Sequence, residues 1–499
     1  MIFDFIKSAI IGKKENQTPR EIRWLETRLS LWLTSPQRIA QIAAVQYYRG
    51  VHDILSKTRE IVGKDGALEV VDNLPNNIII DNQYKKMVDL KKNYLFGKPV
   101  SINGKDTSKV EKVQSILNKS FQRTLGKQGL QAIQAGISWL YITYDDVGNL
   151  KFVSLNASEI MPIWKDSEHT ELQMAVHYYL QEKEFATSVI DYDEKVEIFK
   201  PDGIYYFVRK GGSFIAEPVP FRPYFTKESE DPETKAPATI DMKWDKIPLI
   251  AFKSNSSEIA LIECCKSLQD ALNEILSTFK DNLDEDVRKT ILILDNYDGT
   301  DLGEFRKNLA QYGAVKVRSA DGAKGDVRKL SIEVDADNYE LVVKLLKKAV
   351  VDNCKGYDVK DDSVGGNANQ MHISAMFNDC DIDANETETE FQASLEQVMY
   401  FVSSHLSNSA QINIDEEPIN FIFNRDLLMS ETEILDSLVG AGVKISQKTL
   451  LSQVPFIDDV DQEIKQVKED EKGELEKYGD QFTTSAQDQN QDDDEKAIR

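Results

Sequence analysis

Hydrophobic residues recur at steps of three and four along several long stretches of this chain, which is the spacing of amphipathic helices. Residues 18–60 show it first, with Pro19 and Pro36 near the predicted helix starts. An unbroken helix over residues 257–286 would span about 45 Å at about 1.5 Å per residue, longer than a small domain requires. We therefore predict a strut between two bodies. Its apolar stripe consists of Leu261, Leu268, Leu272, Ile275, Phe279 and Leu283.

Further helical regions follow from the same spacing. Residues 82–95 are predicted to be helical up to Gly97 and Pro99. A helix from Gln370 to about Leu406 is predicted to bend near residues 381–383, where charges interrupt the apolar pattern. Shorter helices are expected at residues 430–440, 446–452 and 458–470. A second strut is predicted at residues 336–353, with one apolar face made of Leu341, Val342, Leu345, Leu346, Ala349 and Val350.

The pattern changes between residues 137 and 214, where aromatic and β-branched residues dominate short stretches separated by turn signals. We predict an antiparallel sheet there, with Trp139 and Trp164 in its core. The charged, proline-containing residues 227–237 are predicted to form a loop. The expected strands are residues 139–144, 150–153, 174–180, 195–200 and 203–208, with two more at 247–252 and 419–423.

Residues 287–334, between the two struts, are predicted to form a small α/β module. Its strands are expected at residues 290–294, near 314–317 and at 330–334, with a helix at 301–311. The module holds nine Lys and Arg against seven Asp and Glu, whereas the whole chain has a formal charge of −24. This local reversal is either a solvated face or a docking surface. Residues 355–369 have two adjacent glycines and no apolar period, so a mobile loop is predicted.

The acidic balance, 84 Asp and Glu against 60 Lys and Arg, excludes a polycation that coats nucleic acid or anionic lipid. Four cysteines provide neither a disulfide framework nor paired metal-ligand spacing, so a reducing, cytosolic setting is expected. Residues 1–14 are predicted to form an amphipathic helix or tail rather than a signal. The chain has no apolar run of about 18 residues, so no membrane-spanning helix is expected.

Motifs for catalysis are weak in this chain. It has no glycine-rich phosphate loop, and its five histidines are scattered without a zinc-binding pattern. Acid pairs at residues 145–146, 361–362 and 458–459 could hold magnesium in a nuclease. Adjacent acids at solvated turns are the far more common case. We expect no enzymatic activity, no metal and no cofactor.

The order of these elements resembles the portal proteins of tailed double-stranded DNA bacteriophages, the head-to-tail connectors, of the type found in long-tailed phages of Gram-positive hosts. Each matching stretch is weak alone, but together they keep the family's order from about residue 40 to 470. The stretches are YYRGVHDI (47–54), YLFGKP (94–99), EIMPIW (159–164), IPLI (247–250), GTDL (299–302), DANE (383–386) before Phe391, and PFIDDV (455–460).

The resemblance implies an α+β, elongated subunit in a ring, typically a dodecamer, at the capsid vertex of the virion. Double-stranded DNA would pass through it, and it would be assembled in the host cytoplasm. Implied partners are the terminase large subunit, scaffolding and major capsid proteins and a head-completion adaptor, with no membrane. The implied domains are a wing (1–255), stem helices (256–286 and 335–354), a clip (287–334), a tunnel loop (355–369), a long bent wing helix (370–410), a helical crown (411–470) and an acidic disordered tail (471–499).

The resemblance also implies two sets of site residues. The tunnel loop would line the DNA channel with Lys355, Asp358, Lys360, Asp361, Asp362, Gly365, Gly366 and Asn367. The clip would dock partners through Asp298, Asp301, Glu304, Arg306, Lys307, Arg318 and Arg328. At residues 365–370 the chain departs from the family's usual small Ser-Gly type helix start. Two rival functions stay open at this point: a metal-dependent phage nuclease that processes DNA, and an acidic scaffold-like structural protein without a pore.

Overall fold

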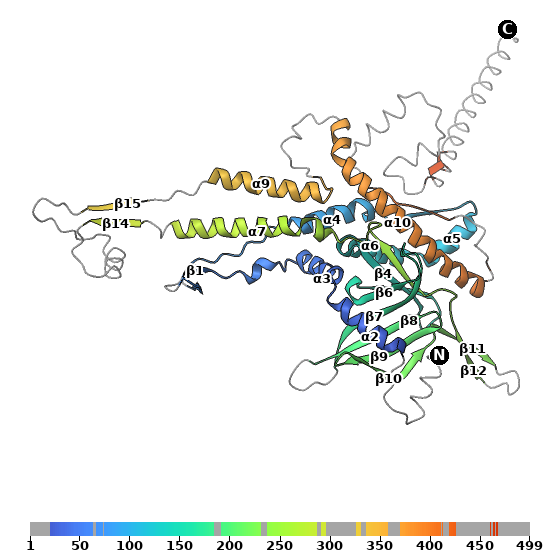
Figure 1. Ribbon diagram of the computed structural model, residues 1–499. Coiled ribbons are helices and arrows are strands. Elements are labelled where there is room, and N and C mark those ends of the chain that lie inside the picture. The colour runs from blue at the N-terminus through green and yellow to red at the C-terminus, as the bar shows by residue number, and fades with distance from the viewer. Residues whose placement is uncertain are drawn as a thin grey trace, which may run out of the picture. The chain divides into compact units, whose positions relative to one another are not determined.

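The computed structural model describes residues 20–62, 66–72, 74–183, 191–230, 237–286, 291–295, 326–330, 336–357, 370–410, 412, 419–425 and five residues between 460 and 467. The chain divides into two compact units, residues 1–426 and 427–499, and nearly all described residues belong to the first. That unit combines helices with antiparallel sheets, which confirms the predicted α+β class (Figure 1).

Two antiparallel sheets stand where the sequence predicted one. A five-stranded sheet has the order β10-β9-β8-β7-β6, and a three-stranded sheet has the order β13-β4-β5. All five strands predicted between residues 137 and 214 are present. The bounds are β4 Ile137–Tyr144, β5 Leu150–Leu155, β6 Ile160–Trp164, β7 Leu172–Glu182, β8 Tyr192–Lys200, β9 Gly203–Lys210, β10 Ser213–Arg222 and β13 Leu249–Lys253.

The loop predicted at residues 227–237 is wrong at both ends, because β11 (Phe225–Glu230) pairs with β12 (Pro237–Met242) in the antiparallel sense. Its middle, residues 231–236, lies outside the described residues. The pair is a separate two-stranded ribbon, where charged residues are well tolerated. Pro237 takes the first position of its strand, which is a position that tolerates proline. Composition alone therefore misled the prediction.

Three other two-stranded ribbons complete the strands. β1 (Glu60–Val62) pairs with β2 (Leu68–Val70), and β3 (Ser101–Asn103) pairs with β16 (Asn420–Ile422), as expected for residues 419–423. β14 (Ile291–Asp295) pairs with β15 (Asp326–Leu330). The second strand therefore begins four residues earlier than predicted, because the register sets Leu330 opposite Ile291. The predicted helix at 301–311 and strand near 314–317 lie outside the described residues.

The predicted helices that fall on described residues are present, whereas those at residues 430–440 and 446–452, and most of the one at 458–470, lie outside the described residues. α3 begins at Pro36 behind Ser35, whose side chain accepts a hydrogen bond from the Arg38 amide. α10 runs unbroken through residues 381–383. The bounds are α2 Arg20–Leu33, α3 Pro36–Tyr48, α4 Gln83–Phe96, α5 Thr107–Ile116, α6 Lys119–Ala135, α7 Leu261–Asp286, α9 Ala336–Asn353 and α10 Gln370–Ala410, with short 3₁₀ turns η1 Asp53–Ser56 and η2 Ala157–Glu159.

Helix α7 begins four residues later than predicted, at Leu261 rather than at residue 257. Glu258 has a φ of 57°, outside the right-handed helical region, and Glu263 accepts a hydrogen bond from the amide of Ala260. The left-handed backbone at Glu258 and this hydrogen bond therefore place the first turn of α7 after residue 260.

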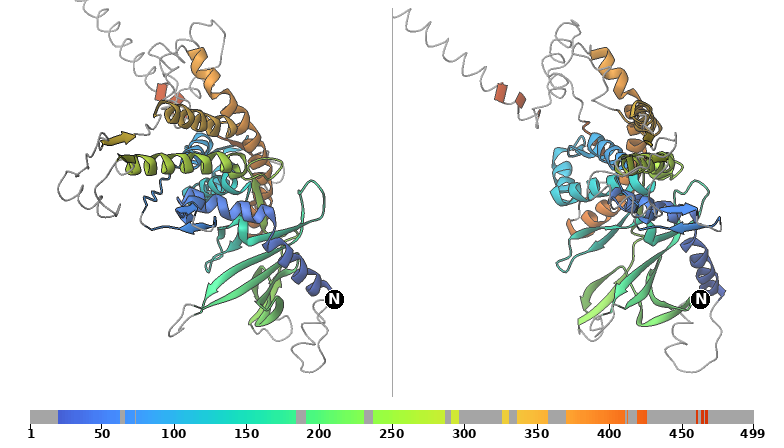
Figure 2. Two further views of the ribbon diagram at one scale, coloured as in Figure 1. Left: turned by 60° about the vertical axis from the view of Figure 1, so that its left-hand side comes forward. Right: turned by 90° about the vertical axis from the view of Figure 1, so that its left-hand side faces the viewer.

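Two hydrophobic cores hold the first unit together. The larger one joins α3, α4, α6, α10 and the three-stranded sheet around Trp139, Phe252 and Phe391, all fully buried. Trp139 stacks on Trp164 at 5.8 Å, as the core prediction required. The smaller core packs α2 against the five-stranded sheet through Leu25 and Leu29 (Figure 2).

The apolar face predicted for α9 is covered only at the C-terminal end of the helix. Val350 is buried, whereas Leu341 and Leu345 are 56% and 58% exposed. α9 packs against α7 in the antiparallel sense (Figure 1). The ring of Phe279 meets that of Tyr339, and the thiols of Cys265 and Cys354 meet at the other end of the pair.

Candidate functional site

The structure describes only two of the residues predicted to form functional surfaces, Lys355 and Arg328. Arg328 lies in β15 opposite Ile293. The other predicted residues of the tunnel loop and clip lie outside the described residues. The contacts around Lys355, where α9 ends and the predicted tunnel loop begins, therefore define the candidate site.

Lys355 ends α9 in a left-handed conformation with a φ of 50°. The amide of Gly356 donates to the carbonyl of Val351 at 2.9 Å, the long-range bond of a Schellman cap. A side chain at Gly356 would meet Met87 of α4, since an added Cβ would lie 2.6 Å from its sulfur. The start of the predicted loop is therefore held closely against α4.

Asp383 of α10 connects this cap to α4. Its carboxylate lies 2.5 Å from the ammonium of Lys91, which is only 7% exposed, and 3.4 Å from that of Lys355. One carboxylate thus neutralises two cations from two other segments. Removing it would leave Lys91 charged and buried, which is costly.

Asp381, two residues before Asp383, belongs to a second group of charges between α10 and the segment after β16. It accepts hydrogen bonds from the hydroxyl of Tyr94 and, at 2.9 Å, from Arg425. Arg425 also pairs with Glu388 at 2.8 Å. Burial lowers the pKa of Arg425, but these two carboxylates outweigh that effect and raise it. The charges that predicted a bend in α10 are therefore contacts between elements.

Buried cysteines lie beside the same junction. Cys265 of α7 and Cys354 at the end of α9 are buried and share a hydrogen bond between their thiols. That bond raises the pKa of Cys265 and lowers the pKa of Cys354. Sequence spacing did not reveal this pair, because its members come from different helices.

A stripe of polar side chains along α7 is the other feature that the sequence reasoning missed. The four side chains are fully buried and occur at every fourth position, so they face one direction along the helix. They hold an extended segment, residues 76–82, which we call the strap. The stripe consists of Gln269, Asn273, Ser277 and Asp281.

Each member of the stripe accepts a hydrogen bond from a backbone amide in or next to the strap. Four residues of helix rise about 6 Å, and two residues of extended chain span about 6.6 Å, so the two repeats match from Asn77 to Asp81. The helix side chains thus supply the hydrogen-bond acceptors that a neighbouring β-strand would supply in a sheet. The bonds run from Asn77 to Asp281 (2.6 Å), Ile79 to Ser277 (2.9 Å), Asp81 to Asn273 (3.2 Å) and Tyr84 to Gln269 (3.0 Å).

We call these four hydrogen bonds the ladder. Two further groups complete it. Lys57 pairs with Asp281 at 2.7 Å. Burial raises the pKa of Asp281, but the amide of Asn77 and the ammonium of Lys57 outweigh it, so the pKa lies below its usual range. The Asn273 amide donates to Nδ1 of buried His52 at 2.9 Å, a bond that only an unprotonated Nδ1 can accept. Burial likewise lowers the pKa of His52.

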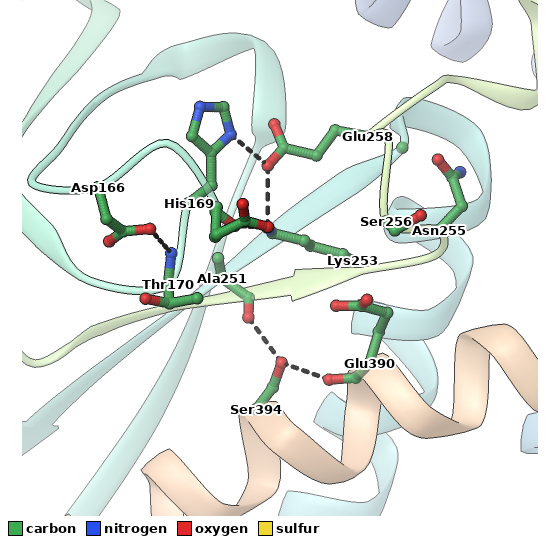
Figure 3. Close-up of polar contacts among 12 residues, drawn as sticks. Asp166, His169, Thr170, Ala251, Lys253, Asn255, Ser256, Glu258, Glu390 and Ser394 are labelled. Atoms are coloured by element: carbon green, nitrogen blue, oxygen red, sulfur yellow. Dashed lines mark hydrogen bonds and ion pairs between the residues drawn. The ribbon is translucent and has the colours of Figure 1, made fainter.

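The segment between β13 and α7 forms a tight elbow (Figure 3). Glu258 is 3.1 Å from Lys253 and 2.8 Å from Nδ1 of His169, and all three side chains come together there. Gly136 has a φ of 79°, and a Cβ at this position would lie 2.1 Å from the carbonyl oxygen of Glu258. Ser394 of α10 donates to the carbonyl of Ala251 at 2.7 Å, so α10 supports the same elbow.

These contacts position helices rather than reacting groups. Within the part of the chain that the structure describes, no three acidic, histidine or cysteine side chains gather to hold a metal. Asp145, from one of the candidate acid pairs, instead accepts hydrogen bonds from the amides of Val147 and Asn149 in its own turn. Among the described helices, none is long and apolar enough to cross a bilayer.

The described part of the chain is built around a pair of long antiparallel helices, α7 and α9. Residues 36–477 match the family described as "Phage portal protein, SPP1 Gp6-like", and the chain belongs to that family. The prediction of a portal-type chain is confirmed.

Two phage portal proteins agree with the family match. The portal protein of Bacillus phage SPP1 is 25% identical over 462 residues, covering 91% of this chain and 87% of the relative. The portal protein of Clostridium phage phiCD119 is 25% identical over 454 residues, covering 88% and 94%. The solved structure "Neck of native GTA particle computed with C12 symmetry" is 13% identical, with a TM-score of 0.39, and covers 75% of this chain and 90% of that one.

Replacing Asp383 with asparagine tests the junction at Lys355. We expect Asp383→Asn to lower the free energy of unfolding by about 2 kcal/mol, because Lys91 stays buried without its countercharge. Urea unfolding measures the change. The control is Glu171→Gln, which breaks an exposed pair with Lys165 and should cost under about 0.5 kcal/mol. Equal effects of the two substitutions would contradict this role of Asp383.

Replacing Asn273 with leucine tests the ladder. Asn273→Leu leaves the amide of Asp81 and Nδ1 of His52 buried without partners, at a cost of about 2 kcal/mol. Amide hydrogen exchange in the strap should therefore accelerate about 30-fold. The control is Glu274→Gln, at an exposed position one residue along the same helix. Unchanged exchange in the strap of Asn273→Leu would show that the ladder does not hold it.

Proposed function

We propose that this chain is a portal subunit that assembles into a closed ring, typically of twelve copies, at one capsid vertex. Double-stranded DNA passes through the ring during packaging and ejection. The observation that carries the proposal is the antiparallel pair α7 and α9, which leads from a body of sheets and helices to the β14–β15 ribbon. The family match over residues 36–477 supports the same role.

The proposed domain boundaries follow from the assignment of the chain as a portal subunit. The wing is assigned to residues 1–255, with the long helix at 370–410, and the stem to residues 256–286 and 335–354. The clip is assigned to residues 287–334, the tunnel loop to 355–369, the crown to 411–470 and the acidic tail to 471–499. The match of α7, α9 and α10 to the expected helices supports these assignments.

The charge of the chain suits a conduit. Each Lys or Arg that contacts a phosphate releases counterions and so binds the DNA more tightly, which would oppose sliding. A formal charge of −24 per chain avoids this. In the proposed channel, Lys355 and Lys360 are isolated positive charges that guide the DNA. Lys355 is the only one of them that the structure describes, and its ammonium shares Asp383 with Lys91, which moderates its attraction for phosphate.

The proposed partners meet the clip, where basic residues outnumber acidic ones. The terminase large subunit docks there during packaging, and a head-completion adaptor follows. Scaffolding and major capsid proteins surround the ring during assembly in the host cytoplasm. The protein has no catalytic role in this proposal and needs no cofactor.

Reversing two clip charges tests the proposal. Arg306→Glu together with Lys307→Glu should weaken binding of the terminase large subunit at least about tenfold, because two attractive charges become repulsive. Biolayer interferometry at fixed ionic strength measures the affinity, and electron microscopy checks that rings persist. The control is Lys151→Glu, an exposed charge in β5 outside the clip.

Two results would contradict the proposal. Terminase binding unchanged by the clip reversal would remove the clip as the docking surface. Magnesium-dependent cleavage of DNA by the purified protein, without closed rings, would favour the nuclease instead.

A further inference from the structure

Two exposed faces in the part of the chain that the structure describes have matching chemistry. The first lies on α9 and consists of Leu341, Leu345 and Lys348, which share one side of the helix at i, i+4 and i+7. The two leucines are 56% and 58% exposed. Lys348 is exposed and has no ion-pair partner among the described residues. We call this set the α9 face.

The second face lies on the β1–β2 ribbon. Leu68 and Val70 are 68% and 61% exposed and point to the same side of β2, two residues apart. Glu60 is the cross-strand neighbour of Val70 and shares that side. We call these three residues the hairpin face. Each face therefore presents two large apolar side chains and one charge, and the two charges have opposite sign.

The segments that lead to the two faces contact α7 at the same level. Lys57, which leads into β1, pairs with Asp281 at 2.7 Å. Tyr339, just before the α9 face, accepts a hydrogen bond from Asn282 at 3.2 Å. Because Asp281 and Asn282 are adjacent, the segments that lead to the two faces are held by the same turn of α7. The ladder holds the strap and Lys57 along α7, so the base of the hairpin is held as well.

The two faces lie on different sides of α7. At about 100° per residue, the direction of Phe279 and Asn282, which contact α9, lies about 130° around the helix from Asp281, which holds the strap. Figures 1 and 2 both show α7 between α9 and β1. The two faces are therefore on separate flanks of one subunit, as expected for partners on neighbouring subunits.

We propose that the α9 face of one subunit docks on the hairpin face of the next copy of this chain. The inference rests on the proposed ring. In a ring of head-to-tail subunits, each contact joins two different patches, and rotation about the ring axis keeps patches at the same level together. Docking buries four apolar side chains and sets Lys348 beside Glu60. The ladder on α7 then has a role in assembly, since it presents the hairpin to the neighbour.

Disulfide cross-linking tests this contact. In a Cys264→Ser background, which removes the exposed native thiol, Leu68→Cys and Leu345→Cys are placed on one chain. Oxidation with copper phenanthroline in air should give a ladder of covalent oligomers on non-reducing gels. A mixture of the two single variants should stop at dimers, because each subunit then offers only one thiol to the contact.

Other outcomes overturn the inference. Dimers from Leu345→Cys alone would mean that α9 pairs with α9. A bond confined to one chain, seen by mass spectrometry of the monomer band, would mean that the faces belong to the same subunit. Closed rings in electron microscopy without any covalent ladder would overturn the contact while leaving the proposed function intact. Monomers at every concentration, without cross-links, would overturn both.

A charge exchange gives a second test that needs no oxidation. Lys348→Glu should lower the equilibrium constant for ring assembly at least about tenfold, measured by analytical ultracentrifugation, and adding Glu60→Lys should restore it. Lys151→Glu is the matched control and should change nothing. Loss of assembly in Lys348→Glu without rescue by Glu60→Lys would show that Lys348 meets another group.

Discussion

The hydrogen bonds between the polar stripe of α7 and the strap are the constraint on which the arrangement around the long helices depends. A helix whose polar side chains are fully buried would be destabilised by several kcal/mol if they lacked partners. Here each one receives a backbone amide, and the match between about 6 Å of helix rise and about 6.6 Å of extended chain makes the bonds simultaneous. Consequently α7, the strap and the root of the β1–β2 hairpin behave as one piece.

A second set of contacts joins this piece to the body of the subunit. Asp383 connects α10, α4 and the end of α9, and the elbow at Glu258 connects β13 to the start of α7. Both use a carboxylate shared between two partners, and in each a buried charge is paired, Lys91 in the first and Glu258 in the second. Such contacts add little net stability compared with apolar packing, but they are specific, because any other arrangement leaves a buried charge unpaired. The start of the proposed tunnel loop is thereby fixed relative to the body.

Much of the fold could be predicted from the sequence, because it rests on periodicity. The three- and four-residue spacing of α7, α9 and α10 and the aromatic strands between residues 137 and 214 mark those elements directly. The α7 start, the β11–β12 pair and the position of β15 depend on local hydrogen bonds or pairing register that composition does not express. The four-residue spacing of the polar stripe, Gln269, Asn273, Ser277 and Asp281, is visible in the sequence. The same spacing is equally typical of a solvent-exposed helix face, so it does not predict the contact with the strap.

The site residues show a similar division. The sequence pointed to Lys355 as the start of a loop, and the structure adds its contact with Asp383, which joins residues far apart in the chain. No local pattern predicts which distant carboxylate a lysine meets.

The central claim, that this chain forms a conduit, is tested most directly by electron microscopy of the purified protein with class averages of top views. The account predicts closed rings with a central hole wide enough for duplex DNA. Oligomers without a hole would contradict it.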